Sequence, residues 1–248
     1  MQEDKSGAAC FLKGAPILGV AISTDGNYAL TSGWDGYAKR WDTQTGELLT
    51  TYEGCNDHRY GIAYSPDGQY VLTNCHDGVM HMYDAQSGDK LRQFTANKEM
   101  IVGVAVSPDG RLALSGSSDK TAHLWDVQTG QEIQLLTGHT TYLYAVAFSP
   151  DGKLALTSSA DHKARLWDLQ TGWELRRFTG HTGAVERAVF SPDGKTFVTS
   201  SDDGTVRMWD VDYHDTIDYL CSNLLRDFTA EERAQYPIMD DKPTCPKS

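Results

Sequence analysis

The chain has 248 residues, of which 40% are hydrophobic, enough for one large globular domain or two small ones. Its formal net charge of −12, with lysine and arginine scattered along the sequence, argues against nucleic acid, because phosphates repel an acidic surface. No apolar run is long enough to cross a membrane, and the N-terminus lacks the pattern of a secretory signal. We therefore expect contact with neither nucleic acid nor membrane.

The cysteines bear on the cellular compartment. There are five, an odd number, and no two form a CxxC pair. This pattern favours free thiols in a reducing environment, so we expect a cytoplasmic protein. The cysteines are Cys10, Cys55, Cys75, Cys221 and Cys245.

From its beginning the chain repeats one unit five times. Its first turn is Ser-Thr-Asp-Gly or Ser-Pro-Asp-Gly and recurs every 42 residues, at Ser23, Ser65, Ser107, Ser149 and Ser191. A closing aromatic-Asp pair recurs at the same interval, at Trp41, Tyr83, Trp125, Trp167 and Trp209. Self-similarity at a fixed period of this length indicates a repeat architecture, in which each unit is one small element packed against its neighbours.

Within each unit, short apolar segments alternate with turns rich in Gly, Asp and Pro, which predicts strands rather than helices. The Asp-Gly pairs suit tight antiparallel hairpins, because Gly adopts a positive φ without strain. Each unit is therefore expected to form a four-stranded antiparallel sheet. In the fourth copy the predicted strands are 143–148, 154–158, 164–167 and 174–178.

After the fifth unit the pattern changes to a helical period. An apolar stripe is formed by Ile217, Leu220, Cys221, Leu224, Leu225 and Phe228. Thr229 and Glu232 have the spacing of a capping box, which predicts the start of a second short helix. We expect residues 8–213 to form the repeat domain and 214–248 a helical or extended tail.

Gly-His, Ser-Pro-Asp-Gly, Ser-x-Asp and Trp-Asp at these spacings resemble the WD-repeat family, whose members are β-propellers. The resemblance implies an all-β, five-bladed β-propeller of four-stranded antiparallel blades. It also implies that the N-terminal strand, near residues 9–14, completes the last blade by pairing with residues 205–209. The tail is similar to the C-termini of bacterial WD-repeat proteins, in which a propeller often follows an NTPase or kinase module.

The resemblance implies that a hydrogen-bond relay of His, Ser, Asp and Trp ties each blade together. The matching residues are His139, Ser159, Asp161 and Trp167 in the fourth copy, and His181, Ser201, Asp203 and Trp209 in the fifth. We expect the Asp to lie between the indole and the imidazole and to serve both. The other copies depart from the pattern: Asn97 replaces the His of the third, and the second has Cys55 and Cys75 at the His and Ser positions.

Two alternatives to a closed ring remain: the five repeats are part of a longer propeller, or two chains combine. We expect a monomer, with self-association if the ring does not close.

Catalysis is not expected. The nucleophile motif GxSxG and the nucleotide motif GxxxxGK[ST] are both missing, and a Ser, His and Asp set that recurs beside a Trp is explained by structure. Cys55, His58, Cys75, His76 and His81 include zinc-ligand types, but the cysteines occupy relay positions and are expected to be buried substitutes. We therefore expect no catalytic residue, no metal and no cofactor.

In the family, partners commonly dock on the face formed by residues at the start of the first strand and residues before the relay Asp. These positions are rich in aromatic, methionine and acidic side chains, which are typical of interface hot spots. We expect a protein or peptide to bind this face, the chain being a scaffold or, alternatively, the sensor portion of a larger signalling protein. The candidate residues are Trp34, Tyr60, His76, Met100, Tyr142, Tyr144 and Glu186.

Overall fold

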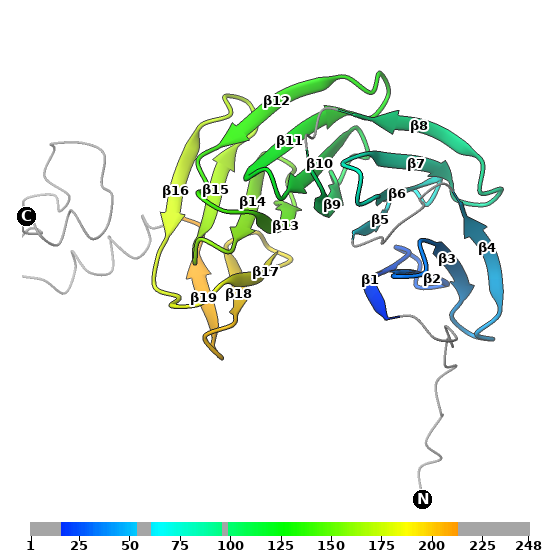
Figure 1. Cartoon of the computed structure of the whole chain (residues 1–248), viewed down its shortest axis with the longest axis horizontal. Coiled ribbons are helices and arrows are strands. Elements are labelled where there is room, and N and C mark those ends of the chain that lie inside the picture. The colour runs from blue at the N-terminus through cyan, green and yellow to red at the C-terminus, as the bar shows by residue number, and fades with distance from the viewer. Residues whose placement is uncertain (1–15, 54–60, 96–98, 213–248) are drawn as a thin grey trace, which may run out of the picture.

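All regular structure is β-strand in the part of the chain that the computed structural model describes, residues 16–53, 61–95 and 99–212. The strands form five antiparallel sheets in which consecutive strands are neighbours (Figure 1). Each repeat therefore builds one blade, and the fold is a five-bladed β-propeller. The strands predicted in the fourth copy are observed, with the second and third each one residue longer.

The strands of blade 1 are β1 (Ile17–Ile22), β2 (Tyr28–Gly33), β3 (Ala38–Asp42) and β4 (Leu48–Tyr52). Those of blade 2 are β5 (Ile62–Tyr64), β6 (Tyr70–Asn74), β7 (Met80–Asp84) and β8 (Lys90–Phe94). Those of blade 3 are β9 (Ile101–Val106), β10 (Leu112–Ser117), β11 (Thr121–Asp126) and β12 (Glu132–Thr137). Those of blade 4 are β13 (Leu143–Phe148), β14 (Leu154–Ser159), β15 (Ala164–Asp168) and β16 (Glu174–Phe178). Those of blade 5 are β17 (Val185–Phe190), β18 (Thr196–Ser201) and β19 (Val206–Asp210).

The Ser-Pro-Asp-Gly turns join the first two strands of each blade. In blade 4 the Ser149 hydroxyl donates to the Asp151 carboxylate (2.6 Å) and accepts from the backbone N–H of Leu154 (2.9 Å). Gly152 has a φ of +72°, a left-handed conformation that costs Gly little. The turn therefore reverses the chain through contacts among its own residues, which is why its sequence alone predicts it.

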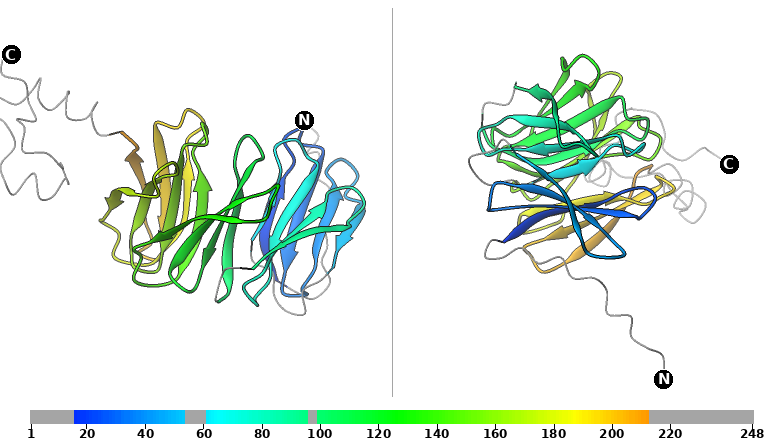
Figure 2. Two further views of the ribbon diagram at one scale, coloured as in Figure 1. Left: turned by 90° about the horizontal axis from the view of Figure 1, so that it is seen from above. Right: turned by 90° about the vertical axis from the view of Figure 1, so that its right-hand side faces the viewer.

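The hydrophobic core lies between the blades. Between blades 3 and 4, Leu114 and Leu124 on one sheet share a buried cluster with Val146 and Trp167 on the other. Equivalent clusters join blades 1 and 2, 2 and 3, and 4 and 5. The sheets accordingly stand next to one another (Figure 2). Residues at or beside the first strands of all five blades line a central hollow of about 320 Å³.

The fifth sheet contains three strands within the described residues, with β19 at its edge. The N-terminal strand expected near 9–14 and the helical tail expected at 214–248 both lie outside the described residues. No helix in the described part has the length and apolar character of a membrane span.

Candidate functional site

The blades present two ends with different loops. At one end, the loop after the second strand meets the segment before the first strand, as when the Ala160 N–H donates to Tyr142 O (3.1 Å). We call this end the relay face. At the opposite end, the Ser-Pro-Asp-Gly turns meet the loops after the third strand, as when the Leu169 N–H donates to Lys153 O (3.0 Å). We call that end the turn face.

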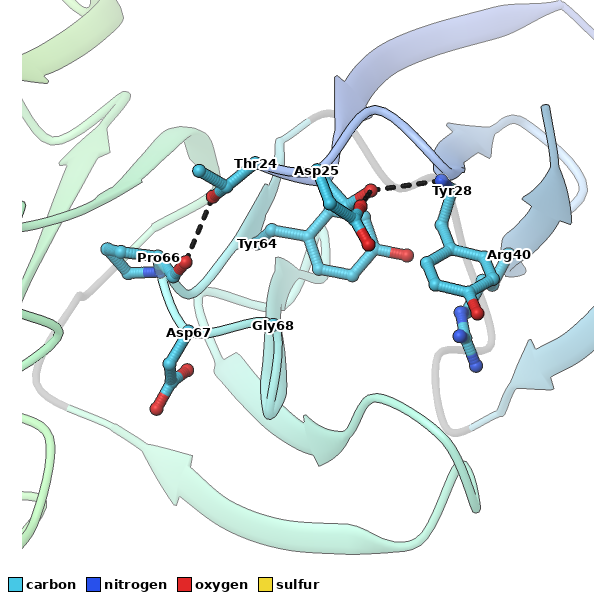
Figure 3. Close-up of a pocket in the computed structure, with 9 residues that line it drawn as sticks. Thr24, Asp25, Tyr28, Arg40, Tyr64, Pro66, Asp67 and Gly68 are labelled. Atoms are coloured by element: carbon cyan, nitrogen blue, oxygen red, sulfur yellow. Dashed lines mark hydrogen bonds between the residues drawn. The ribbon is translucent and has the colours of Figure 1, made fainter.

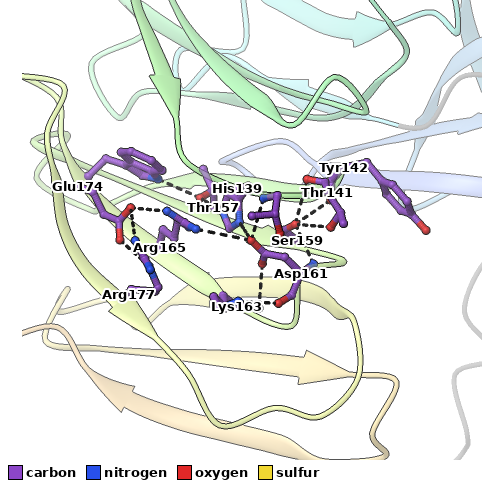
Figure 4. A network of polar contacts seen from close by, with 12 residues as sticks. His139, Thr141, Tyr142, Thr157, Ser159, Asp161, Lys163, Arg165, Glu174 and Arg177 are labelled. Carbon is purple, nitrogen blue, oxygen red and sulfur yellow. Dashed lines mark hydrogen bonds and ion pairs between the residues drawn. The ribbon is translucent and has the colours of Figure 1, made fainter. Parts of the chain in front are cut away.

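A continuous polar chain runs through blade 4 beneath the relay face (Figure 4). The Trp167 indole N–H donates to Thr157 Oγ1 (2.9 Å), and Thr157 Oγ1 lies 2.8 Å from His139 Nε2. On the other side of the ring, His139 Nδ1 lies 2.8 Å from Asp161 Oδ2. Since the threonine accepts from the indole, its own proton goes to Nε2, and Nδ1–H donates to the carboxylate.

This donor pattern requires a neutral His139. Burial lowers the pKa of His139 below its ordinary value, although the hydrogen bond to Asp161 opposes the shift. For Asp161, burial acts to raise the pKa, but hydrogen bonds from His139 and the Thr140 N–H outweigh it and hold the pKa at about 2. Asp161 is therefore ionised and His139 neutral near pH 7.

The observed relay differs from the expected one in the residue that links the indole to the imidazole. The Asp does not contact the indole; instead, a threonine joins the indole to the imidazole. Blade 5 has the same arrangement as blade 4, because Trp209 Nε1 and His181 Nε2 both bond Thr199 Oγ1. Sequence reasoning missed this residue, although its signal is present. A hydroxyl occupies the position in every copy: Thr31, Thr73, Ser115, Thr157 and Thr199.

The relay serines hold backbone rather than the imidazole. Ser159 is fully buried, and its hydroxyl accepts from the Asp161 N–H (3.1 Å) and donates to Tyr142 O (2.9 Å). Both nitrogens of His139 are engaged by Thr157 and Asp161. Ser159 and His139 thus do not form the nucleophile–base hydrogen bond of a hydrolase.

Blades without the relay histidine keep part of the hydrogen-bond relay. Trp41 Nε1 donates to Thr31 Oγ1 in blade 1, and Trp125 Nε1 donates to Ser115 Oγ in blade 3, both at 2.9 Å. In blade 2, the Tyr83 hydroxyl donates instead to the backbone carbonyl of Glu53.

Cys75 corrects the expectation of free thiols. It is 2% exposed and disulfide-bonded. Cys75 is the only cysteine among the described residues. The argument for a reducing compartment loses its support at this position.

Within the described residues, no three His, Cys, Asp or Glu side chains are grouped as metal ligands would be.

One recurring backbone bond places three of the candidate residues on the relay face, Trp34, Met100 and Tyr142. The residue before the relay Asp donates its N–H to the carbonyl of a residue before the first strand. The pairs are Trp34 to Pro16 (3.1 Å), Ser118 to Met100 (2.8 Å), Ala160 to Tyr142 (3.1 Å) and Asp202 to Ala184 (3.0 Å). Blades 1, 3, 4 and 5 therefore present these positions in the same way, on a rigid support.

Aromatic side chains are exposed at two of these positions. Trp34 is 51% exposed and Tyr142 is 44% exposed. Tyr142 also packs edge-on against Tyr144, with ring centroids 5.2 Å apart, and the two hydroxyls are 3.4 Å apart. His76 is exposed and Met100 is half-buried, whereas Tyr60 lies outside the described residues.

Acidic groups follow the tyrosine pair onto blade 5. Burial, and then the nearby charge of Asp202, raise the pKa of Glu186, while Arg187 and a hydrogen bond with Tyr144 oppose the shift. The hydrogen bond with Tyr142, burial and then the charge of Glu186 raise the pKa of Tyr144. The structure thus brings Tyr142, Tyr144 and Glu186 together across the junction of blades 4 and 5.

Comparison with known families agrees with the fold. The family model for the WD domain, G-beta repeat, matches residues 9–42, 46–84, 88–126, 130–168 and 172–210. A search of curated protein sequences returned no significant match. The five matches cover most of the sequence, and each ends with the third strand of a blade. The chain therefore belongs to the WD domain, G-beta repeat family.

Proposed function

We propose that this protein is a non-catalytic scaffold that binds a protein or peptide on its relay face. Members of this family generally mediate protein–protein interactions. The observation that carries the proposal is that equivalent backbone bonds hold the exposed Trp34 and Tyr142, and the acidic Asp202, on the relay face. A rigid scaffold that presents variable side chains on loops is suited to recognition.

The charges on the relay face favour a partner segment that is basic and carries apolar side chains. Glu186 and Asp202 lie in blade 5, and in blade 3 Glu99 accepts a hydrogen bond from the Ser118 hydroxyl (3.1 Å). Trp34 and Tyr142 add exposed aromatic surface on which an aliphatic or guanidinium group can pack. The net charge of −12 adds attraction at long range, which salt will screen.

Affinity capture with a matched pair of variants tests the proposal. The variant Trp34→Ala/Tyr142→Ala removes exposed rings from the relay face, and Trp173→Ala removes a 74% exposed ring from the turn face. We expect both to unfold at the wild-type temperature, because neither change touches the core. Only the first should lose its partners, by roughly tenfold or more in affinity, as expected for hot-spot residues. Equal capture by wild type and the double variant would overturn the proposed site.

A charge variant tests the basic character of the partner. Glu186→Gln keeps the shape of the side chain and removes its charge. We expect the variant to bind its partner more weakly and with a smaller salt dependence. Binding by the wild type should also decline as acid protonates Glu186, and the variant should not show this decline. That decline should begin at a higher pH than for an ordinary glutamate, because the pKa of Glu186 is raised by burial and Asp202. Binding that is insensitive to salt would contradict a basic partner.

A further inference from the structure

A second hollow lies on the turn face, between blades 1 and 2 (Figure 3). Its volume is about 250 Å³, and the first turns of both blades contribute to its walls. The lining side chains that matter chemically are Asp25, Tyr28, Arg40 and Tyr64. We call this hollow the blade-junction pocket. It lies at the opposite end of the blades from the relay face.

Arg40 and Tyr64 depart from the repeat at positions that are otherwise apolar. Arg40 lies in β3, and the other four copies have Met82, Leu124, Leu166 and Met208 at its position. Tyr64 lies in β5, and the corresponding residues are Ile22, Val106, Phe148 and Phe190. Between blades 2 and 3, 3 and 4, and 4 and 5, these positions help to fill the core, with Leu124 and Leu166 at most 2% exposed. The junction of blades 1 and 2 has a guanidinium and a phenol instead.

The guanidinium of Arg40 is only partly satisfied. It stacks on the Tyr28 ring, 3.8 Å from the ring centroid, and Nη1 donates to Ala85 O (3.3 Å). Its Nε is buried without a hydrogen-bond partner among the described residues. The Tyr64 hydroxyl is also buried and interacts with the adjacent Arg40 side chain, but a guanidinium cannot accept a proton, so the phenol proton has no acceptor among these residues. A buried charge or hydroxyl without a partner carries a desolvation penalty that a bound acceptor would remove.

Both orphan groups are donors at neutral pH. Arg40 carries a permanent positive charge. Burial raises the pKa of Tyr64 to about 12, although the adjacent Arg40 opposes the shift, so the phenol keeps its proton. Two donors beside one positive charge match the two oxygens of a carboxylate. An acceptor that binds both would therefore be a carboxylate with its oxygens toward Arg40 and Tyr64.

Asp25 restricts the ligand further. Its carboxylate stands on the pocket wall between Tyr64 and Tyr28 (Figure 3), and hydrogen bonds from Ser23 and Asn27 keep its pKa below the ordinary value. A fixed negative charge at this place disfavours a phosphate dianion. It favours a ligand that has an N–H donor close to its carboxylate.

We propose that the blade-junction pocket binds a carboxylate with a neighbouring N–H group, as in an α-amino acid or the C-terminal residue of a peptide. The carboxylate lies on Arg40 and Tyr64, and the N–H group faces Asp25. The two sources share this chemistry. They differ only in whether the nitrogen is a free ammonium or a peptide amide.

Isothermal titration with defined probes tests the pocket. The probes are glycine, trialanine with a free C-terminus, trialanine amide and inorganic phosphate. We expect glycine or free-acid trialanine to bind and the amide and phosphate to bind at least about tenfold more weakly, the loss expected from one charge-assisted pair. Glycine binding identifies a free amino acid as the source, and trialanine binding alone identifies a peptide C-terminus. No binding of either acid, or tighter binding of phosphate, would overturn the proposal.

Three variants separate recognition from folding. Arg40→Met installs the side chain that blade 2 has at this position, so it should fold and be at least as stable as wild type. Tyr64→Phe removes one donor and preserves the ring. Both should weaken binding of the acid probe roughly tenfold or more. Arg92→Met is the control, because Arg92 bonds Thr129 O and Gln128 O of blade 3 and is remote from the pocket. Unchanged affinity in a folded Arg40→Met variant would contradict the assignment.

Discussion

At the scale of single residues, the order of groups in the blade 4 relay follows from which of them can donate and which can accept a hydrogen bond. Trp167 can only donate, and ionised Asp161 can only accept, so the two groups between them must each accept on one side and donate on the other. A threonine hydroxyl and a neutral imidazole meet this condition. The relay is therefore a structural device, and each member depends on the next.

Thr157→Val tests this dependence. The substitution keeps the shape of the side chain, removes the hydroxyl and leaves both the Trp167 indole and His139 Nε2 without a partner. We expect a loss of about 1–3 kcal/mol in the free energy of unfolding, the cost of stranding buried polar groups. Denaturant unfolding measures it. Thr157→Ser is the control, since Ser115 bonds the indole in blade 3, and equal stability of both variants would contradict the relay.

The relay also makes stability depend on pH. The pKa of folded His139 is lowered by burial, so as the pH falls below about 6.5 the unfolded chain takes up a proton that the folded chain does not. Asp161 causes a second loss of stability at lower pH. Its folded pKa of about 2 is below its ordinary value of 3.8, so its contribution to the free energy of unfolding is present above pH 4 and disappears toward pH 2. Stability should therefore decline with acid in two stages.

Denaturant unfolding at pH 7.5, 5.5 and 3 measures this decline. His139→Asn installs the residue that the third copy has at the equivalent position, and this variant should be less stable than wild type at pH 7.5. It should also lose less between pH 7.5 and 5.5 than wild type does. Parallel losses in the two proteins over that interval would show that His139 does not contribute.

At the scale of the blade, the loop between the second and third strands reveals local strain. The same position has a positive φ in every copy, and three copies have Gly there: Gly36, Gly78 and Gly204. The other two have Lys120, with φ of +77°, and His162, with φ of +68°. Residues with a Cβ are disfavoured in this conformation, by about 1–2 kcal/mol.

Lys120→Gly and His162→Gly should each stabilise the protein. We expect about 0.5–1 kcal/mol per site, less than the full strain because Gly also increases the entropy of the unfolded chain. Thermal unfolding checks the direction of the change. Lys153→Gly is the control at a turn residue outside the left-handed region, where the same substitution should destabilise. Destabilisation at all three positions would rule out the relief of strain.

At the scale of the whole molecule, one face of blade 5 is left uncovered by the residues that the structure describes. Val206 is 69% and Met208 73% exposed, whereas the equivalent Ala164 and Leu166 of blade 4 are each 2% exposed. The family matches suggest what covers part of it. Each later match begins just before the outer strand of one blade and ends in the third strand of the next. The first match begins at residue 9, so by the same pattern we expect its first residues to correspond to an outer strand.

Deletion of residues 1–14 tests closure by this segment. If it supplies the fourth strand of blade 5, the truncated chain should unfold at lower temperature and associate through the uncovered edge of β19. Size-exclusion chromatography with light scattering, together with thermal unfolding, measures both effects. A truncated chain that stays monomeric with wild-type stability would contradict closure by residues 9–14.

The prediction of the fold succeeded because its signals are local. The Ser149–Gly152 turn is built from contacts among its own residues, and the strands that follow it are set by apolar segments of matching length. The prediction of the relay was incomplete for a related reason. Trp167 and Thr157 are ten residues apart and meet only after β14 and β15 pair, so the pairing register decides which hydroxyl receives the indole N–H.

By itself, the sequence determined the number of blades, their turns and their strand order, because a 42-residue period and turn chemistry act over short distances. Only the tertiary structure decided which atoms meet between distant segments. It replaced the expected Asp with Thr157 at the indole, placed Cys75 in a disulfide, and set Arg40 of β3 against Tyr64 of β5. These contacts depend on how one blade packs on the next, and no single repeat carries that information.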